Sequence, residues 1–176
     1  MSGHNKWSQI KHKKAKTDGQ KAKVFSKYSK LITVEVKKAN GDKNAAGVRA
    51  MIERARAENV LNDVIDRAIK KATEVGGKEM ESIIYETYGP GGCAIIIEAL
   101  TDNKNKAAQE VKFILSGNGL TLASIGSATW AFEKKGSEWI PKTTIEVTDE
   151  DADLLGKLVE ELEANDEVQD VFTNAE

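Results

Sequence analysis

The pattern of hydrophobic residues in this chain changes from helical to strand-like at Gly76-Gly77, and the sign of the charge changes at the same place. Residues 1–78 hold 19 Lys and Arg against 8 Asp and Glu, whereas residues 79–176 hold 7 against 20. These balances of +11 and −13 nearly cancel, so the net charge of the whole chain is only −2. A simultaneous change of periodicity and charge indicates two separately folded parts, and we predict domains at 1–76 and 79–176 joined by the two glycines.

The first part is predicted to be a basic bundle of three helices. Between residues 18 and 39, apolar side chains recur at helical spacing opposite a row of lysines, and this helix is expected to stop at Asn40-Gly41. Two shorter amphipathic stretches follow, which Asn44 and Asn62 are placed to cap. Three helices joined by short turns pack as a small bundle. The apolar residues expected to face its core are Phe25, Tyr28, Ile32, Val36, Ala39, Val48, Met51, Ile52, Ala55, Ile65, Ala68, Ile69 and Ala72.

The second part is predicted to contain strands and helices. The predicted strands cover residues 83–88, 93–100, 127–133, 143–147 and 168–172. Gly89-Pro90-Gly91-Gly92 is interpreted as a tight turn and not as a phosphate loop, because it lacks the Gly-Lys-Ser/Thr ending and no helix follows it. Helices are expected after Asp102-Asn103 and over 149–163. Helices interspersed among the strands of one sheet predict an α+β fold, with a two-layer α/β sandwich after the three-helix bundle.

Positive charge is concentrated at the start of the chain. From Lys6 to Lys30 there are nine lysines and one acid, a pattern typical of a segment that binds a phosphate backbone, although a solvated basic tail has the same composition. Residues 1–16 show no helical or strand periodicity, so we interpret them as an arm that becomes ordered on its partner. Trp7 would then stack on an unpaired base or fill a pocket of its own domain. The candidate nucleic-acid-binding residues are His4, Lys6, Trp7, Lys11, His12, Lys13, Lys14, Lys16, Lys21, Lys23, Lys27 and Lys30.

Five short segments are similar to those of one known family, and they occur in the same order. They are GHNKWSQIKHKK at 3–14, YETYGPGG at 85–92, DNKN at 102–105, GSA at 126–128 and DEVQDVF at 166–172. They resemble the YebC family of probable transcriptional regulatory proteins, which includes the mitochondrial translational activator of cytochrome c oxidase. The resemblance implies either a DNA-binding transcriptional regulator or a translation factor that associates with the ribosome. Family members usually carry a third lobe, which we expect to be absent here near 136–143.

Other classes of protein are disfavoured by the residues themselves. No histidines and acids fall at metal-ligand spacing, no serine sits in a nucleophile elbow, and the single cysteine, Cys93, excludes an internal disulfide and a cysteine-based zinc site. We therefore expect no enzyme, no metal and no cofactor. No apolar run reaches the roughly 18 residues that span a bilayer, and the N-terminus lacks the apolar stretch of a signal peptide. We expect a soluble, cytoplasmic protein in a reducing compartment.

The function predicted from the sequence is a non-catalytic, nucleic-acid-binding regulator of gene expression. We favour a translation factor on ribosomal RNA, because a flexible arm with Trp7, His4 and His12 suits the unpaired bases of folded RNA better than the regular groove of a duplex. A DNA-binding transcriptional regulator is the first alternative, and an interaction module without nucleic acid is the second. The protein is expected to be a monomer. The candidate second contact consists of Tyr85, Tyr88, Gly89, Pro90, Gly91 and Gly92.

Overall fold

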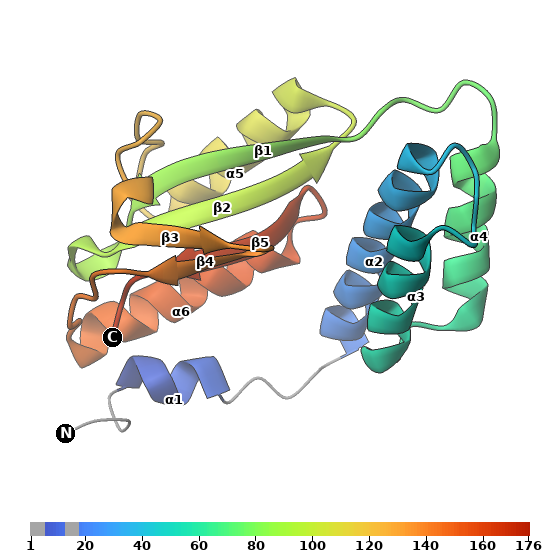
Figure 1. Ribbon diagram of the computed structural model, residues 1–176. Coiled ribbons are helices and arrows are strands. Elements are labelled where there is room, and N and C mark those ends of the chain that lie inside the picture. The colour runs from blue at the N-terminus through green and yellow to red at the C-terminus, as the bar shows by residue number, and fades with distance from the viewer. Residues whose placement is uncertain (1–5, 13–17) are drawn as a thin grey trace. The chain divides into compact units, whose positions relative to one another are not determined.

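The computed structural model describes residues 6–12 and 18–176, which fall into two compact units (Figure 1). Among the described residues, one unit is formed by 18–81, and the other by 82–176 together with 6–12. In the second unit the helix α1 (Lys6–His12) packs on the helix α6 (Asp149–Ala164). The prediction that residues 1–16 lack helical structure is therefore wrong for residues 6–12. The reason is that a seven-residue helix with one apolar pair, Trp7 and Ile10, is too short to show a period.

The first unit is the expected bundle of three helices. They are α2 (Asp18–Lys38), α3 (Ala46–Ala57) and α4 (Asn62–Thr73). The predicted stripe of α2 is confirmed, because Ile32 and Val36 are fully buried and Tyr28 is nearly so. Val48, Ala55, Ile65 and Ala68 complete the core from the other two helices.

The turns of the bundle confirm one sequence prediction and contradict two. After α2 the chain turns through Asn40 and Gly41, whose φ angles of 51° and 86° are left-handed, and the Gly41 amide bonds the Val36 carbonyl at 2.9 Å. Asn44 and Asn62 do not cap their helices. The residues at the cap positions are Ala45 and Leu61, and neither provides a side-chain hydrogen bond.

The second unit is built on a three-stranded sheet. Its strands are β1 (Glu81–Tyr88), β2 (Ala94–Thr101) and β5 (Val168–Thr173), in the order β1-β2-β5. β2 and β5 are antiparallel and pair Ile96 with Phe172. The central strand β2 is almost entirely buried because both of its faces are covered. On one face, Ile95 and Ile97 pack in a core with residues of α5 (Lys104–Gly117) and α6, and Figure 1 shows these two helices beside the sheet.

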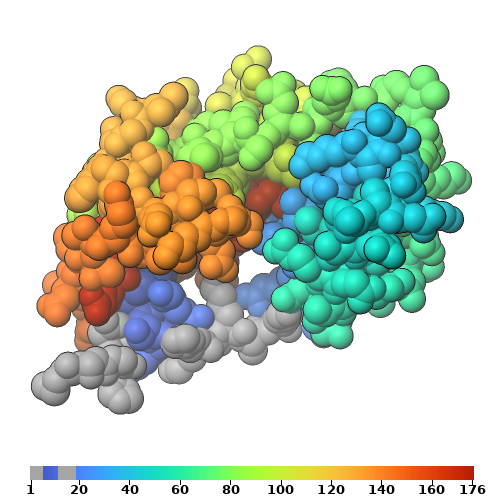
Figure 2. Space-filling view, viewed as in Figure 1, coloured from blue at the N-terminus to red at the C-terminus, as the bar shows by residue number. Residues whose placement is uncertain are grey.

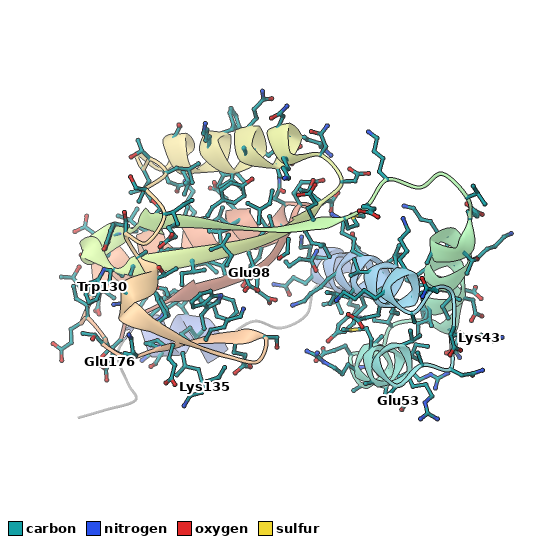
Figure 3. All side chains as sticks on the ribbon, turned by 45° about the horizontal axis from the view of Figure 1, so that its top comes forward. Lys43, Glu53, Glu98, Trp130, Lys135 and Glu176 are labelled. Carbon is teal, nitrogen blue, oxygen red and sulfur yellow. The ribbon has the colours of Figure 1, made fainter. Side chains whose placement is uncertain are left out.

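The other face of the sheet is covered by a small antiparallel ribbon of β3 (Phe132–Lys135) and β4 (Glu138–Pro141). Phe132 of this ribbon packs on Ala94 and Ile96. Glu98 of β2 points toward the ribbon, where it accepts hydrogen bonds from the Lys134 ammonium and, at 2.8 Å, from the Trp139 indole N–H (Figure 3). An ion pair and an indole bond therefore attach the ribbon to the sheet.

The α+β fold is confirmed, but two of its predicted strands are wrong and the strands form two sheets, not one. Residues 129–131 form a 3₁₀ turn, and a strand begins only at Phe132. Residues 143–147 contribute a single parallel bridge, Ile145 to Ala175. The first error arises because the amides of 126, 128 and 129 bond a side chain instead of a neighbouring strand.

Candidate nucleic-acid interface

Four of the candidate lysines lie in the N-terminal half of the helix α2. Lys21 is exposed, and Lys23, Lys27 and Lys30 are half-buried. Each of the four also takes part in a polar or electrostatic interaction in the structure. Lys37 lies on the same helix but is occupied, since its ammonium donates to the carbonyl of Lys78 at 3.1 Å. The four candidate lysines thus place the basic surface of α2 on its N-terminal half.

Helix α1 carries Lys6 and Lys11. The Lys6 ammonium is 3.6 Å from the Asp153 carboxylate in a largely exposed ion pair. Lys11 is exposed, with its ammonium 5.9 Å from the centre of the Trp7 ring. A pair of this kind is weak in water, so both charges remain accessible to a stronger anion.

Trp7 fills a pocket of its own unit and does not face solvent. It is only 4% exposed and belongs to the core beneath α6. Ile10 of the same helix lies close to Gly156, where a Cβ would be 3.0 Å from Cγ2 of Ile10. Of the two roles considered for Trp7, its burial supports the filling of a pocket in its own unit.

The remaining N-terminal candidates cannot be placed. His4, Lys13, Lys14 and Lys16 lie outside the described residues. His12 is the last residue of α1, and only its backbone is described.

The predicted turn at 89–92 is confirmed, and the structure explains why glycine occupies positions 89 and 91. The Gly89 amide bonds the Cys93 carbonyl at 2.8 Å, which closes the connection between β1 and β2. A Cβ on Gly89 would lie 2.5 Å from Cδ1 of Ile95, so only glycine fits without a shift. Gly91 has a φ of 72° and faces Asp151 of α6. Pro90 and Gly92 complete this turn, which is a packed element beside an acidic helix.

The two tyrosines of the hairpin have different environments. Tyr85 is half-buried against the helix-side core, where burial and then the charge of Glu167 raise the pKa of its phenol. Tyr88 is 39% exposed, and its hydroxyl donates to the Ser127 carbonyl and accepts from the Trp130 indole N–H. Of the two tyrosines, Tyr88 is thus the one that a ligand can reach.

A buried carboxylate that the sequence pattern did not single out organises this end of the sheet. Glu86 is 4% exposed and accepts hydrogen bonds from the amides of Gly126, Ala128 and Thr129 at 2.7, 2.9 and 2.7 Å. Burial alone would raise the pKa of Glu86, but the three amide bonds outweigh it and hold the pKa below its ordinary value. A charge on the core-facing side of an alternating strand is the sequence signal that could have revealed it.

A second basic group, which is not among the predicted site residues, lies on α3. Arg49 and Arg56 are exposed, two turns apart on one side of the helix, and line a shallow depression with Ile52. Glu53 pairs with Arg56 at 2.9 Å. Their spacing of seven residues was the available signal.

Metal and thiol chemistry find no support in the described residues. Across 6–12 and 18–176, no group of three His, Cys, Asp or Glu side chains is arranged to hold a metal ion. The thiol of Cys93 is fully buried, and burial raises its pKa, which keeps it in the unreactive protonated form. No helix in the described part of the chain has the length and apolar character required to cross a membrane.

Comparison with known proteins places this geometry in a family. A model described as the TACO1/YebC protein N-terminal domain matches residues 5–75, and one described as the TACO1/YebC second and third domain matches 80–138 and 136–175. The chain belongs to the TACO1/YebC family. The resemblance stated from the five sequence segments is confirmed.

Relatives in the TACO1/YebC family match most or all of the chain. A "Probable transcriptional regulatory protein" of Thermoanaerobacter pseudethanolicus is 37% identical, with 100% of this chain and 97% of the relative covered. One from Petrotoga mobilis is 45% identical over 85% of this chain and 61% of the relative. The crystal structure of a conserved hypothetical protein from Aquifex aeolicus superposes with a TM-score of 0.82 at 29% identity, covering 97% of this chain and 96% of that one.

The match to the second TACO1/YebC model is broken at one place. Its two segments meet at 136–138, on the turn between β3 and β4. The alignment with the Thermoanaerobacter relative runs over 239 positions, whereas this chain has 176 residues, so that relative has residues with no counterpart here. A short turn joins β3 directly to β4 at the position where the sequence predicts that a lobe is absent.

Proposed function

We propose that this protein is a regulator of gene expression that acts by binding nucleic acid, without catalysis, through α2 and the basic N-terminal segment. The observation that carries the proposal is the side of α2 opposite its buried stripe, on which Lys23, Lys27 and Lys30 recur at helical spacing. The sequence around this helix adds to its positive charge, because residues 6–30 hold nine lysines against one acid. The names of the relatives, probable transcriptional regulatory proteins, support the regulatory role.

The preferred nucleic acid is ribosomal RNA, and the preferred role is that of a translation factor. The lysines lie along α1 and α2 and not at the start of the second helix of a helix-turn-helix, which is the position that reads duplex DNA. An acidic unit would also be repelled by a long regular duplex lying along the molecule. Folded RNA offers phosphates at irregular positions to which separate lysines can bind.

A lysine charge reversal tests the nucleic-acid surface. Replacing Lys11, Lys13 and Lys14 by Glu should weaken binding to RNA and DNA of any sequence, and should flatten the dependence of log K on log salt by about 0.7 to 0.9 for each phosphate that is no longer neutralised. The matched control replaces Lys112, Lys142 and Lys157, three exposed lysines of the acidic unit, and changes the net charge equally. If the two variants weaken nucleic-acid binding equally, only the total charge of the protein matters, and the proposed interface is wrong.

A second experiment separates RNA from DNA. The protein should sediment with ribosomal particles in a sucrose gradient of a cell lysate, and should leave them at high salt. A genome-wide DNA occupancy map should show no discrete peaks. Absence from the ribosomal fractions together with sharp promoter peaks would establish the DNA-binding alternative, which the names of the relatives favour.

A further inference from the structure

The longest uncharged stretch of the chain lies within its acidic unit. Residues 113–132 contain no Asp, Glu, Lys, Arg or His, although 31% of the whole chain is Asp, Glu, Lys or Arg. Residues 87–97 form a second uncharged stretch. Both stretches lie within a unit that is otherwise strongly charged.

The two uncharged stretches meet at the end of the sheet. The Ala123 amide bonds the Glu86 carbonyl at 2.8 Å, which lays the chain beside the edge of β1. Farther along, the Tyr88 hydroxyl donates to the Ser127 carbonyl, and the Trp130 indole N–H donates to the Tyr88 oxygen at 2.9 Å. We call residues 123–130 the neutral loop.

The neutral loop has a fixed backbone and exposed apolar side chains. Glu86 holds three of its amides from the buried side. On the outer side, Ile125 is 97% exposed and Trp130 is 56% exposed. Figure 2 shows gold-coloured residues of this part of the chain protruding at the upper left, and Figure 3 labels Trp130 at the end of the sheet. A rigid loop that presents a large aromatic ring to water is typical of a binding surface.

The charges around the loop decide which ligand chemistry fits it. Residues 82–176 hold 7 Lys and Arg against 18 Asp and Glu, so a phosphate backbone is repelled over most of this unit. The neutral loop contributes neither an acid that repels phosphate nor a base that binds it. The indole N–H of Trp130 is already committed to Tyr88, so the ring offers its face and not its hydrogen bond. An uncharged, flat, aromatic group meets all of these conditions, and in a nucleic acid that group is an unpaired base.

We propose that the neutral loop is a base-binding surface, on which Trp130 stacks against an unpaired base of RNA and Ile125 packs against the neighbouring base. This inference rests on the proposed function, because the lysines of the N-terminal segment must hold the same RNA by its phosphates. The two surfaces then divide the work. The lysines supply affinity that depends on salt, and the neutral loop supplies binding to single-stranded bases that does not.

The test compares variants of the full chain on two probes, a single-stranded RNA oligonucleotide and an RNA duplex of the same length. Trp130→Ala should weaken binding to the single strand by about five- to a hundred-fold, the range for removal of one base stack. The slope of log K against log salt should not change, because the lysines still neutralise the same phosphates. Trp130→Phe should restore part of the affinity, and Ile125→Ser should cause a smaller decrease. Binding to the duplex should be unaffected by all three.

The matched control is Phe113→Ala. Phe113 is 79% exposed on α5, so the control removes an exposed aromatic ring from the helix-covered side of the same sheet. It should bind both probes as the wild type does. Trp130 and Ile125 are largely exposed, so thermal unfolding should report the same fold for every variant.

The outcomes separate this inference from the proposed function. Trp130→Ala could bind the single strand with wild-type affinity while the triple variant of Lys11, Lys13 and Lys14 still binds RNA more weakly. That result would overturn the base-binding surface and leave the proposed function standing. Equal weakening on single strand and duplex would overturn it too. Wild-type protein that binds neither probe would overturn both. If Trp130→Ala keeps its RNA affinity but loses a nuclease-resistant protein association, the neutral loop belongs to a protein partner, and the inference fails.

Discussion

At the scale of single residues, Glu86 fixes a loop of the second unit to the sheet. Three backbone amides converge on one buried carboxylate, so the loop that crosses the end of the sheet is held by charge-assisted hydrogen bonds and not by strand pairing. Glu86→Gln keeps the size of the side chain but turns an NH₂ group toward amide donors. We expect a decrease of about 1–3 kcal/mol in the free energy of unfolding, measured by urea denaturation at neutral pH.

The same residue predicts a dependence on pH. The pKa of Glu86 is lower in the folded protein than its ordinary value, so its contribution is present above the unfolded pKa and is lost as the pH falls through the folded pKa. The difference in unfolding free energy between wild type and Glu86→Gln should therefore shrink under acidic conditions. A difference that stays constant from neutral to acidic pH would show that Glu86 acts through packing alone. Glu110→Gln, a half-buried carboxylate on α5, is the control.

At the scale of elements, α1 is attached to α6 by a close approach at Gly156. Gly156→Val should force Ile10 away by overpacking, at a cost of about 1–3 kcal/mol, and should release α1. Trp7 would then become exposed, which a red shift of tryptophan fluorescence and faster proteolysis at Lys6 and Lys11 should report. Asp153→Asn removes only an exposed ion pair and should leave α1 in place. Unchanged fluorescence in Gly156→Val would mean that α1 tolerates the added volume.

Long amphipathic elements were predictable from the sequence, and elements defined by tertiary interactions were not. The stripe of α2, the hairpin at 83–100 and the helix at 149–163 follow from periodicity and turn residues. Thr148 and Asn103 cap α6 and α5 through their side chains, but Asn44 and Asn62 fail to cap, because cap geometry is decided by the turn that precedes each helix. The apparent strand at 127–133 was wrong because a distant carboxylate captures its amides.

The candidate site was predictable only as a region of charge. Counting lysines located the basic N-terminal segment, but it could not reveal that Lys37 bonds backbone carbonyls or that Trp7 is buried. Burial of Trp7 requires α6, which lies at the other end of the chain, and no local pattern contains that information. The exposure of Trp130 was missed because the sequence predicted this residue to lie within a strand, whereas it lies in a 3₁₀ turn.

At the scale of the whole molecule, the chain passes between its two units at two places, near 15–16 and near 81–82. A cut at a protease site introduced between Gly76 and Gly77 leaves α1 on the N-terminal fragment, although its binding surface is on the C-terminal one. We expect the cut protein to elute as one species in gel filtration and to separate only in denaturant.

The same cut in a Trp7→Ala background is the control for this prediction. Truncating a buried tryptophan costs roughly 3–5 kcal/mol in a protein core, which should be enough to let the fragments part. Fragments that separate at once in the wild-type background would show that α1 is not held firmly on α6. A first cleavage by a general protease within 83–132 would contradict the division into two units.

The attachment of α1 also sets an order of events during synthesis. Trp7 is made before α6, which begins at Asp149, roughly 140 residues later. At a synthesis rate of about 5–20 residues per second, Trp7 and the lysines of α1 are made on the order of ten seconds before α6, the helix on which α1 packs. The three-helix unit can fold in that interval, since all of its residues have been made by Glu81. The nascent chain therefore leaves its most basic segment undocked beside the ribosome that is making it until the final helix emerges.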